Sequence, residues 1–248
     1  MTQALESLLG LLHLPAIKAG YERIGQLAIA EHSSYEEYLE QLLIEEVEQR
    51  HANKITRNLK SSRLPLEKTL DIFDRSRLDP RTDKLLSVLV KGEFTRSSEN
   101  ILAFGSPGSG KTHLLCAVGH ELIQQGKKVL FYPSSLLIQE LLVAKRDLQL
   151  GRYFKRLDKM DAIIIDDIGY VSQEKQEMDV LFTFLADRYE KTSLLISSNL
   201  PFSKWEQIFK DPMTTAAAID RLVHHSVIIE MNMKSYRLET ANKAKRNG

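Results

Sequence analysis

The sequence predicts an α/β fold in which helices cover both faces of a parallel sheet, preceded by a small all-helical N-terminal domain. Two observations predict it. In the second half of the chain, short continuous apolar runs alternate with helical patterns, which is typical of strands buried on both faces of a sheet. Residues 1–65 instead carry only helical periodicity. Ligands of such sheets bind at the carboxyl ends of the strands, so we expect the functional residues there.

Composition limits the class of protein. The formal net charge of +1 at pH 7 excludes a uniformly basic nucleic-acid coat but allows local basic patches. The single cysteine, Cys116, excludes a disulfide framework and fits a small buried residue. No apolar run approaches the length of a membrane span, and the N-terminus lacks the pattern of a secretory signal. We therefore expect a cytoplasmic protein that does not bind a membrane.

The N-terminal domain is predicted to consist of helices. Residues 5–12 and 17–28 carry apolar side chains at helical spacing, which predicts two short helices. Ser34 and Glu37 form a capping-box pattern, so a longer helix begins there and runs to about Leu59.

The second half of this long helix is basic. Four cations fall within one stripe at about 100° per residue, and a fifth follows the helix. The stripe would suit the phosphates of DNA. It would equally suit a solvated face whose cations favour the C-terminal end of the helix dipole. The residues concerned are Arg50, Lys54, Arg57, Lys60 and Arg63.

The long helix ends at Leu64-Pro65-Leu66, and we place the domain boundary there. Residues 1–65 then form a helical domain for DNA binding and oligomerisation, and residues 66–248 form the domain built on the sheet. Within the second domain, residues 66–79 lack a long periodic pattern and are predicted to be a linker that packs onto the sheet domain.

Short apolar runs are predicted to form the strands of the sheet. Helical patterns separate them, as the crossover connections of parallel strands require. The predicted strands are residues 101–104, 129–132, 162–165, 194–197 and 227–229.

A phosphate-loop motif follows the first predicted strand and precedes a helix. Gly105-Ser106-Pro107-Gly108-Ser109-Gly110-Lys111-Thr112 fits the pattern G-x-x-x-x-G-K-[ST] in the context that the motif requires. The glycines allow backbone N–H groups to converge on phosphate oxygens, and the helix N-terminus adds to the same field. Lys111 is expected to reach the β- and γ-phosphates and Thr112 to bind Mg²⁺. We predict that the loop, together with His113, binds a nucleoside triphosphate.

Acidic and amide side chains follow the next strands of the sheet. Ile163-Ile164-Ile165 runs directly into Asp166 and Asp167, the Walker B pattern, with Asp166 placed for the Mg²⁺ shell and Asp167 for the attacking water. Asn199 ends the following strand, where it would touch the γ-phosphate or the water. Alternatively, Asn199 forms a turn before Pro201.

Arg221 ends an alanine-rich helix before the last strand. An arginine there could point across a subunit interface at a neighbour's γ-phosphate, because its delocalised charge matches the transition state. Alternatively it forms an ion pair with Asp220 or Asp211. Spacing leaves both possibilities open.

Two adjacent histidines, His224 and His225, follow this helix. Zinc ligands are typically spaced apart and accompanied by cysteines, so this pair has poor spacing for zinc. We expect both side chains to face solvent or DNA.

Taken together, these motifs resemble the AAA+ ATPases of the DnaA/DnaC clade, most closely the IstB-type ATP-binding helper proteins of bacterial insertion sequences. The stretch from Ser198 to Trp205 is the most discriminating, because a generic ATPase has no need of it. Besides the phosphate loop, the resemblance is carried by Leu14-Pro15-Ala16, Tyr35-Glu36-Glu37-Tyr38-Leu39, Ile165-Asp166-Asp167-Ile168-Gly169, Ser198-Asn199-Leu200-Pro201-Phe202-Ser203-Lys204-Trp205, Asp220-Arg221-Leu222 and Ser235-Tyr236-Arg237.

The resemblance implies a P-loop AAA+ core and a role in transposition. Such proteins bind ATP and Mg²⁺, form oligomers with ATP at the subunit interfaces, assemble on duplex DNA largely without regard to sequence, and deliver it to a transposase that they stimulate. By resemblance, Lys111 and Thr112 are the Walker A pair, Asp166 and Asp167 Walker B, Asn199 sensor 1 and Arg221 the arginine finger.

The resemblance also implies where DNA binds. In this clade a helical insertion before Walker B contributes to the DNA surface, and the basic stripe of the N-terminal helix becomes a second contact. The corresponding insertion here is residues 133–158, whose cations are Lys145, Arg146, Arg152, Lys155 and Arg156.

Two departures from the wider AAA+ pattern affect what we expect. Asp167 stands where many members have glutamate, so we expect slow ATP hydrolysis that DNA, assembly or the transposase stimulates. Little sequence follows the last predicted strand, so we expect no full helical lid, and Arg237 is a doubtful sensor 2.

Two other functions are alternatives to the transposition helper. A helicase loader of the DnaC type would share the ATP site but hand a helicase onto DNA, and residues 198–205 and the N-terminal region favour the transposition helper over it. A GTPase is disfavoured, since the guanine-reading Asn-Lys-x-Asp does not follow the phosphate loop, and a small-molecule kinase is disfavoured, since no lid arginines are arranged for a kinase acceptor.

Overall fold

The computed structural model describes residues 2–170, 174–205, 208, 211–231 and 233. The chain divides into two compact units, Met1–Arg57 and Asn58–Gly248. The division falls within one helix, α3 (Tyr35–Ser62). Within the described residues, none of the helices combines the length and the apolarity that crossing a bilayer requires.

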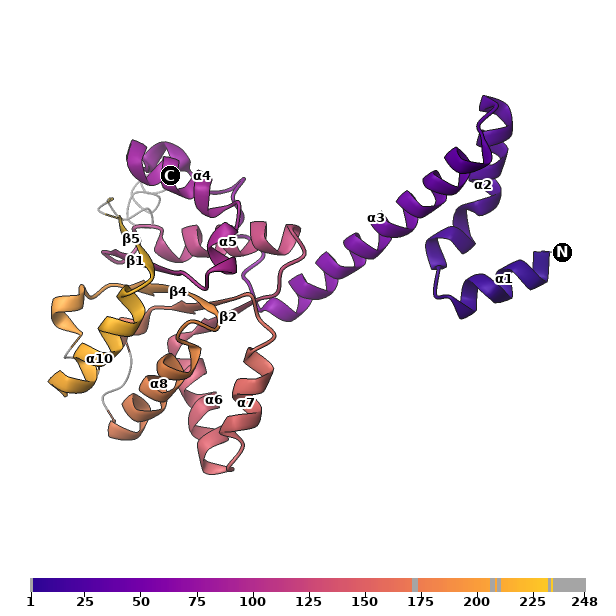
Figure 1. Ribbon diagram of the computed structural model, residues 1–248. Coiled ribbons are helices and arrows are strands. Elements are labelled where there is room, and N and C mark those ends of the chain that lie inside the picture. The colour runs from indigo at the N-terminus through magenta and orange to yellow at the C-terminus, as the bar shows by residue number, and fades with distance from the viewer. Residues whose placement is uncertain (1, 171–173, 206–207, 209–210, 232, 234–248) are drawn as a thin grey trace, which may run out of the picture. The chain divides into compact units, whose positions relative to one another are not determined.

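The N-terminal unit is helical (Figure 1). It contains α1 (Thr2–Leu11), α2 (Pro15–Glu31) and the larger part of α3, so both the two short helices and the longer one were predicted in the right places. A small core of apolar side chains joins the three helices and is formed by Leu9, Ile17, Ile24 and Leu42. The capping box at the start of α3 is present: the N–H of Glu37 donates to Ser34 Oγ, and the N–H of Ser34 donates to Glu37.

A buried carboxylate fixes the start of α2 within this unit. Glu46 of α3 is 3% exposed and accepts the N–H groups of Ala16 and Ile17 at 2.8 and 3.2 Å. Arg50 donates to its other oxygen at 2.8 Å. Burial disfavours the charged form, but the bonds from Arg50 and from the two N–H groups outweigh it and hold the pKa of Glu46 below its usual range.

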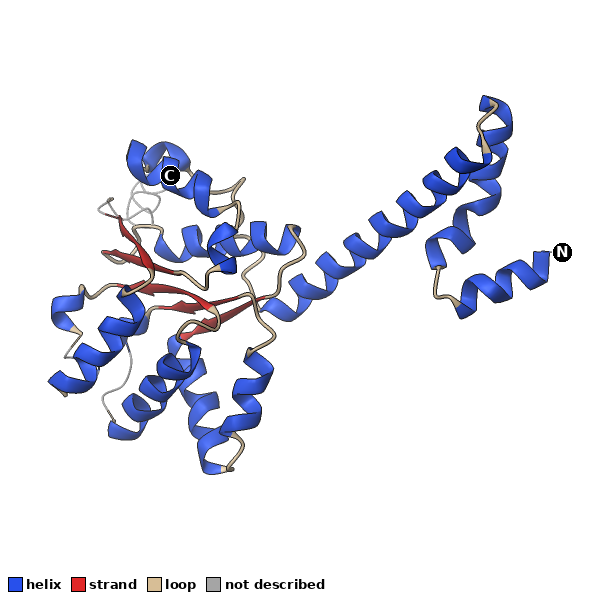
Figure 2. Ribbon diagram, viewed as in Figure 1, coloured by secondary structure: helices blue, strands red, loops and turns tan. Residues whose placement is uncertain are grey.

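The second unit is built on a five-stranded sheet in which every neighbouring pair is parallel (Figure 2). The strand order is β2-β3-β4-β1-β5, which places the phosphate-loop strand between β4 and the edge strand β5. All five strands were predicted within a residue or two of their ends. Their bounds are β1 (Asn100–Gly105), β2 (Val129–Pro133), β3 (Ala162–Asp166), β4 (Ser193–Ser198) and β5 (Ser226–Met231).

Helices cover both faces of this sheet, as predicted (Figure 1). One face carries α4 and α5, and the other carries α6, α7, α8 and α10. Isoleucines of β3 such as Ile163, Ile164 and Ile165 are fully buried between these layers, which explains their continuous apolar run. The helices are α4 (Pro80–Leu89), α5 (Lys111–Gln124), α6 (Ser134–Arg146), α7 (Leu150–Leu157), α8 (Lys175–Arg188) and α10 (Pro212–Val223).

The last turns of α3 and the segment after it pack on the sheet unit. Asn58 donates to the carbonyls of Gly126 and Lys127 at 3.2 and 3.0 Å. Leu64 and Phe73 are buried. This segment therefore leads directly to the carboxyl ends of the strands, where α5 begins.

Candidate nucleotide-binding site

The phosphate loop joins β1 to α5 and needs its glycines. Gly108 and Gly110 have φ angles of +81° and +96°, a region that side chains with a Cβ rarely adopt. A Cβ on Gly105 would collide with the main-chain oxygen of Met231 at the end of β5. The loop thus takes a shape that presents main-chain N–H groups at the start of α5.

Lys111 lies at the mouth of this loop. Its side chain is mostly covered, at 6% exposure, and Nζ donates to the carbonyls of Gly105 and Ser106 at 2.9 and 3.0 Å. Ser109 Oγ, in the same loop, is buried without a hydrogen-bond partner among the described residues. A buried hydroxyl in that state calls for an explanation, and an oxygen of a bound phosphate would supply the partner.

Oxygen atoms suited to Mg²⁺ gather beside the loop. Thr112 Oγ1 donates to Asp166 Oδ1 at 2.7 Å, which joins the first turn of α5 to the end of β3. Ser197 Oγ of β4 donates to the same carboxylate oxygen at 2.6 Å. Mg²⁺ prefers hydroxyl and carboxylate oxygens and retains several waters, so this donor set fits it. Sequence reasoning named Thr112 and Asp166 but missed Ser197.

Asp167 follows Asp166 with an unusual backbone. Its φ angle is +65°, which is uncommon for a residue with a side chain. Its N–H donates to Ser197 Oγ at 2.8 Å, and its carbonyl accepts from Ser134 Oγ at 2.9 Å. Two serines from neighbouring elements therefore hold the backbone that orients the Asp167 side chain, an arrangement that often marks functional sites.

Asn199 lies just beyond the end of β4, close to Gly169. Its Oδ1 is buried without a hydrogen-bond partner among the described residues, and a Cβ on Gly169 would collide with it. The turn that follows uses the neighbouring serine instead: Ser198 Oγ accepts the N–H of Leu200 and donates to its carbonyl. The alternative role that the sequence left open for Asn199, forming this turn, is therefore filled by Ser198.

A pocket of about 220 Å³ opens beside the loop. One wall comes from the segment that the sequence identified only as a linker, and the other from the loop and α5. His113 connects the two: its Nε2 lies 2.9 Å from the Thr69 carbonyl, and its ring meets Phe73 edge-on at 5.1 Å. The lining residues are Lys68, Ile72, Phe73, Asp74, Arg77, Gly108, Ser109, Gly110, Lys111, Thr112, His113 and Met233.

Sequence reasoning missed the linker wall of this pocket. Residues 66–79 have no long periodicity, so no motif marked them. The apolar residues Leu70, Ile72 and Phe73 predicted that this segment packs onto the sheet domain, but not that it lines a pocket beside the phosphate loop. His113, the partner of Phe73, was predicted to bind nucleotide only because it follows the loop.

Arg221 lies away from its own phosphate loop. Its guanidinium stacks 5.2 Å from the ring centroid of Phe182 on α8, and Nη1 donates to the Ala217 carbonyl. The end of α10 bonds to the amino end of β1, where Asn100 Nδ2 donates to the carbonyl of Leu222. The phosphate loop begins at the carboxyl end of β1, so roughly 17 Å of strand separates the loop from the end of α10.

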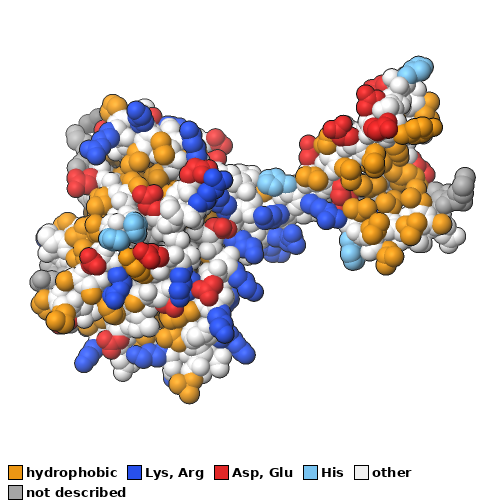
Figure 3. All heavy atoms as spheres, in the orientation of Figure 1, with side chains coloured by type: hydrophobic (Ala, Val, Ile, Leu, Met, Phe, Trp, Pro, Cys, Tyr) orange, Lys and Arg blue, Asp and Glu red, His pale blue; other side chains and the backbone are white. Residues whose placement is uncertain are grey.

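The basic residues predicted to bind DNA fall into two groups. Those of the helices after β2 are exposed: Lys145, Arg146, Arg152, Lys155 and Arg156. Arg146 pairs with Asp147 at 2.9 Å, and Arg156 stacks 4.7 Å from the centroid of the Tyr153 ring. On this face, Lys and Arg of the sheet unit are interspersed with acids (Figure 3).

Two arginines of the predicted basic stripe already form ion pairs with acids of their own unit. In the first unit Arg50 pairs with Glu46, and its guanidinium also donates to the carbonyl of His13. In the second unit Arg63 pairs with Glu140 at 2.8 Å and stacks 4.9 Å from the centroid of the Tyr132 ring. Lys54, Arg57 and Lys60 are exposed.

One predicted residue lies outside the described part of the chain. Arg237, named above as a doubtful sensor 2, belongs to residues 234–248, as do its neighbours Ser235 and Tyr236.

Comparison with protein families finds one match over most of the chain. Residues 7–244 match the family of the IstB-like ATP binding protein. A putative insertion sequence ATP-binding protein of Sinorhizobium fredii is 40% identical over 95% of this chain and 80% of its own length. The IS21 putative ATP-binding protein of Pseudomonas aeruginosa is 36% identical over 97% of this chain and 91% of its own length.

Solved structures show the same fold at low identity. The DnaC helicase loader superposes with a TM-score of 0.58 at 15% identity, over 67% of this chain and 98% of that one. AMPPCP-bound DnaA from Aquifex aeolicus superposes with a TM-score of 0.57 at 17% identity, over 75% of this chain and only 57% of that one. The sheet unit therefore has the P-loop AAA+ fold.

Proposed function

Because the chain belongs to the IstB-like ATP binding protein family, we propose that it is an ATP-dependent helper of transposition that assembles on duplex target DNA and stimulates a partner transposase. The observation that carries the proposal is the oxygen cluster of Thr112, Asp166 and Ser197 beside a glycine-rich loop, in which the Ser109 hydroxyl has no hydrogen-bond partner within the part of the chain that the structure describes. The relatives at 40% and 36% identity are named insertion sequence ATP-binding proteins. The likeness to the helicase loader is one of fold alone.

ATP is the substrate of this site. The loop N–H groups bind its phosphates, and Lys111 exchanges the carbonyls of Gly105 and Ser106 for phosphate oxygens. The nucleoside enters the pocket between the linker segment and His113, where Phe73 offers an apolar surface.

Hydrolysis needs an oriented water and a stabilised γ-phosphate. Thr112 and Asp166 would hold Mg²⁺, which neutralises phosphate charge when it is bound. Asp167 orients the attacking water from a backbone fixed by Ser134 and Ser197. Asn199 contributes its amide to the γ-phosphate or to the same water. We expect turnover to be slow in the isolated chain, because Asp167 is one methylene shorter than glutamate.

Arg221 completes the site of a neighbouring subunit. Arg221 lies near the amino end of β1, whereas the phosphate loop of the same subunit lies at the carboxyl end of that strand. This position suits an arginine that contacts the ATP of a neighbouring subunit. Oligomers would then contain ATP at their subunit interfaces and assemble more readily when ATP is bound.

Duplex DNA binds through its phosphates. Positive charge comes from the exposed cations of α6 and α7 and from the exposed lysines of α3. Contacts between these side chains and phosphates do not read the bases, so we expect little sequence preference. Delivery of this DNA to a transposase is the step that hydrolysis would regulate.

Transposition tests the proposal most directly. The natural chain and its Lys111→Ala variant are compared in a reaction that contains the transposase of the same insertion sequence, donor DNA and target DNA. We expect ATP-dependent stimulation of target insertion by the natural chain and none by the variant. Equal insertion with and without the natural chain would contradict the proposal.

A further inference from the structure

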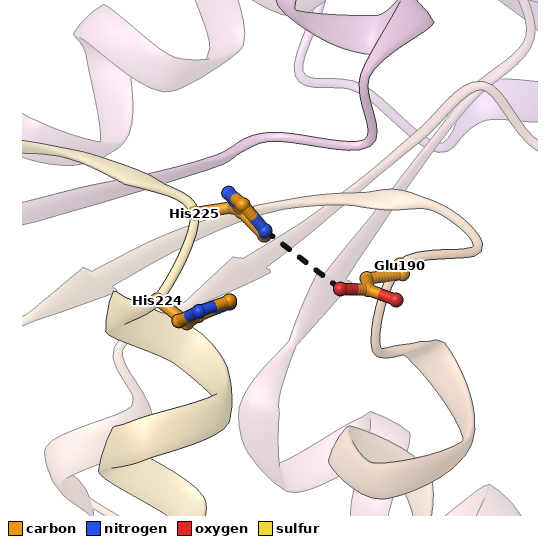
Figure 4. A group of neighbouring side chains, drawn as sticks. All are labelled: Glu190, His224 and His225. Atoms are coloured by element: carbon orange, nitrogen blue, oxygen red, sulfur yellow. Dashed lines mark ion pairs between the residues drawn. The ribbon is translucent and has the colours of Figure 1, made fainter.

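A cluster of three exposed side chains lies at the amino ends of the strands, away from the phosphate loop (Figure 4). Glu190 belongs to the turn between α8 and β4, and His224 and His225 belong to the turn between α10 and β5. One ring nitrogen from each histidine and one oxygen of Glu190 lie within 4.8 Å of one another. His225 Nε2 is 3.7 Å from Glu190 Oε1.

Helix termination brings the two histidines together. Within a helix, adjacent side chains point about 100° apart. Because α10 ends at Val223, the rings of His224 and His225 meet edge-on, with centroids 4.2 Å apart. Glu190 reaches them from a backbone with a φ angle of +56°, held in a turn in which the N–H of Lys191 donates to the carbonyl of Arg188.

A neighbouring hydroxyl can fix the tautomer of one histidine. Tyr189 Oη lies 3.0 Å from His224 Nδ1. When Nδ1–H donates to this hydroxyl, the lone pair of Nε2 is free to bind a metal. Metal-bound histidines commonly have such a partner on the other ring nitrogen.

We propose that Glu190, His224 and His225 bind a divalent transition-metal ion of the zinc type, with water in the remaining position. Two imidazoles and one carboxylate suit Zn²⁺ and its neighbours in the first transition row, and they do not suit Mg²⁺ or Ca²⁺. Tetrahedral zinc needs ligand atoms about 3.3 Å apart. The three ligand atoms, which now lie within 4.8 Å of one another, must therefore move closer together. Rotation of the exposed side chains can supply that movement, since Glu190 and His225 are 58% and 53% exposed.

From the sequence, these histidines were predicted to have poor spacing for zinc, because only residues close to them in the chain were considered as further ligands. The third ligand comes from Glu190, on a different turn that the parallel sheet brings alongside. Each of the two turns lies between a helix and the strand that follows it, and such turns meet at one edge of the sheet.

The bound ion would tie α10 to the end of α8. Arg221 lies in the last turn of α10, three residues before His224, and stacks on Phe182 of α8. Metal binding would therefore restrict the helix that carries the proposed arginine finger. This consequence rests on the proposed function, whereas the metal site itself does not.

Calorimetric titration of the full chain with Zn²⁺, without nucleotide, tests the site. We expect one ion per chain, and more than about tenfold weaker binding in each of the variants Glu190→Gln, His224→Gln and His225→Gln. Tyr189→Phe should weaken binding by about tenfold, because it removes the partner of His224 Nδ1 and leaves the three ligands in place. His51→Gln, which changes an exposed histidine of α3, is the matched control and should bind as the natural chain does.

Hydrogen exchange supplies a second measurement that locates the ion. Zn²⁺ should slow the exchange of amides in residues 189–192 and 222–226 of the natural chain, and should leave them unchanged in His225→Gln. Undiminished zinc affinity in the His224 and His225 variants would overturn the proposal, as would slowed exchange elsewhere but not in these two turns. Neither measurement depends on ATP, so the metal site can fail while the proposed function stands.

Discussion

Asp166 shows how much of the site a sequence pattern predicts at the scale of a residue. An apolar strand that ends in two acids indicated this carboxylate, and the structure places one of its oxygens 2.7 Å from the Thr112 hydroxyl, beside the phosphate loop. Ser197 was missed, although it donates to Asp166 and accepts from the Asp167 N–H. No motif specifies a serine there; its role arises from the pairing of β3 with β4.

Replacing Ser197 with alanine should impair catalysis and stability together. The partly buried N–H of Asp167 loses its acceptor, which should lower the free energy of unfolding by about 1 kcal/mol. Asp166 and Asp167 should then be less well oriented, so kcat should fall further than ATP affinity. Denaturant unfolding and steady-state ATPase assays measure the two effects. Ser203→Ala, at an exposed position beyond β4, is the control; an unaltered kcat in Ser197→Ala would contradict the assigned role.

Replacing Phe73 with alanine tests the pocket that sequence reasoning missed. The ring forms the edge-on contact with His113 and lines the pocket beside the loop. We expect ATP affinity to fall by about tenfold, since one aromatic contact is worth roughly 0.5–1.5 kcal/mol beyond its burial. Binding of a fluorescent ATP analogue measures the change. Exposed Ile72 lines the same pocket, and Ile72→Ala should have a smaller effect; equal affinities for Phe73→Ala and the natural chain would rule out the pocket as the nucleoside site.

At the scale of an element, α2 depends on a carboxylate from another helix. Its own N-cap position is Leu14, which offers no capping oxygen, and Glu46 of α3 takes over that role. The helix could be predicted from its periodicity, but its cap could not, because Glu46 lies far along the chain and becomes adjacent only when α2 packs on α3.

The cap predicts how stability depends on pH. The pKa of Glu46 is lowered in the folded chain. The ionised carboxylate therefore adds its full contribution to the free energy of unfolding above the pKa that Glu46 has in the unfolded chain, about 4.3. That contribution is lost as the pH falls through the lower pKa of the folded chain. Glu46→Gln should destabilise the N-terminal unit by roughly 1 kcal/mol at pH 7. The difference from the natural chain should shrink below about pH 4.

Helical circular dichroism during unfolding, recorded between pH 3 and pH 7, measures this dependence. Glu48→Gln is a matched control, because Glu48 is an exposed residue of the same helix. If Glu46→Gln lowers the free energy of unfolding by the same amount at every pH, then charge on Glu46 does not stabilise the cap.

The strands and helices of the sheet unit were predicted well for a physical reason. The four strands β1 to β4 are largely buried, so their apolar runs are continuous, and the edge strand β5 is buried mainly at Ile229 and Met231. Residues 66–79 were the exception. Besides the 3₁₀ turn Arg75–Arg77, they hold their place through the contacts of Thr69 and Phe73 with His113.

At the scale of the whole molecule, DNA binding should depend on phosphate contacts. Each exposed cation of α7 that contacts a phosphate should contribute to the dependence of affinity on salt. Arg152→Glu and Lys155→Glu should each weaken duplex binding similarly for unrelated sequences and reduce the salt slope by about 1. Fluorescence anisotropy at several salt concentrations measures both.

A charge reversal elsewhere provides the control for these variants. Arg96 is exposed and pairs with Glu93 before β1, so Arg96→Glu makes the same change of charge outside α6 and α7. If Arg96→Glu weakens DNA binding as much as the α7 variants do, DNA binds elsewhere or responds only to net charge.

We propose that ATP, bound by one subunit and completed by Arg221 of the next, holds an oligomer on duplex DNA. Analytical ultracentrifugation of the chain with duplex DNA, with and without a non-hydrolysable ATP analogue, tests it most directly. We predict large DNA-bound assemblies only with the analogue, and their loss in Arg221→Ala although that variant still binds nucleotide as an isolated subunit. Assemblies of the same size without nucleotide, or undiminished in Arg221→Ala, would contradict the account.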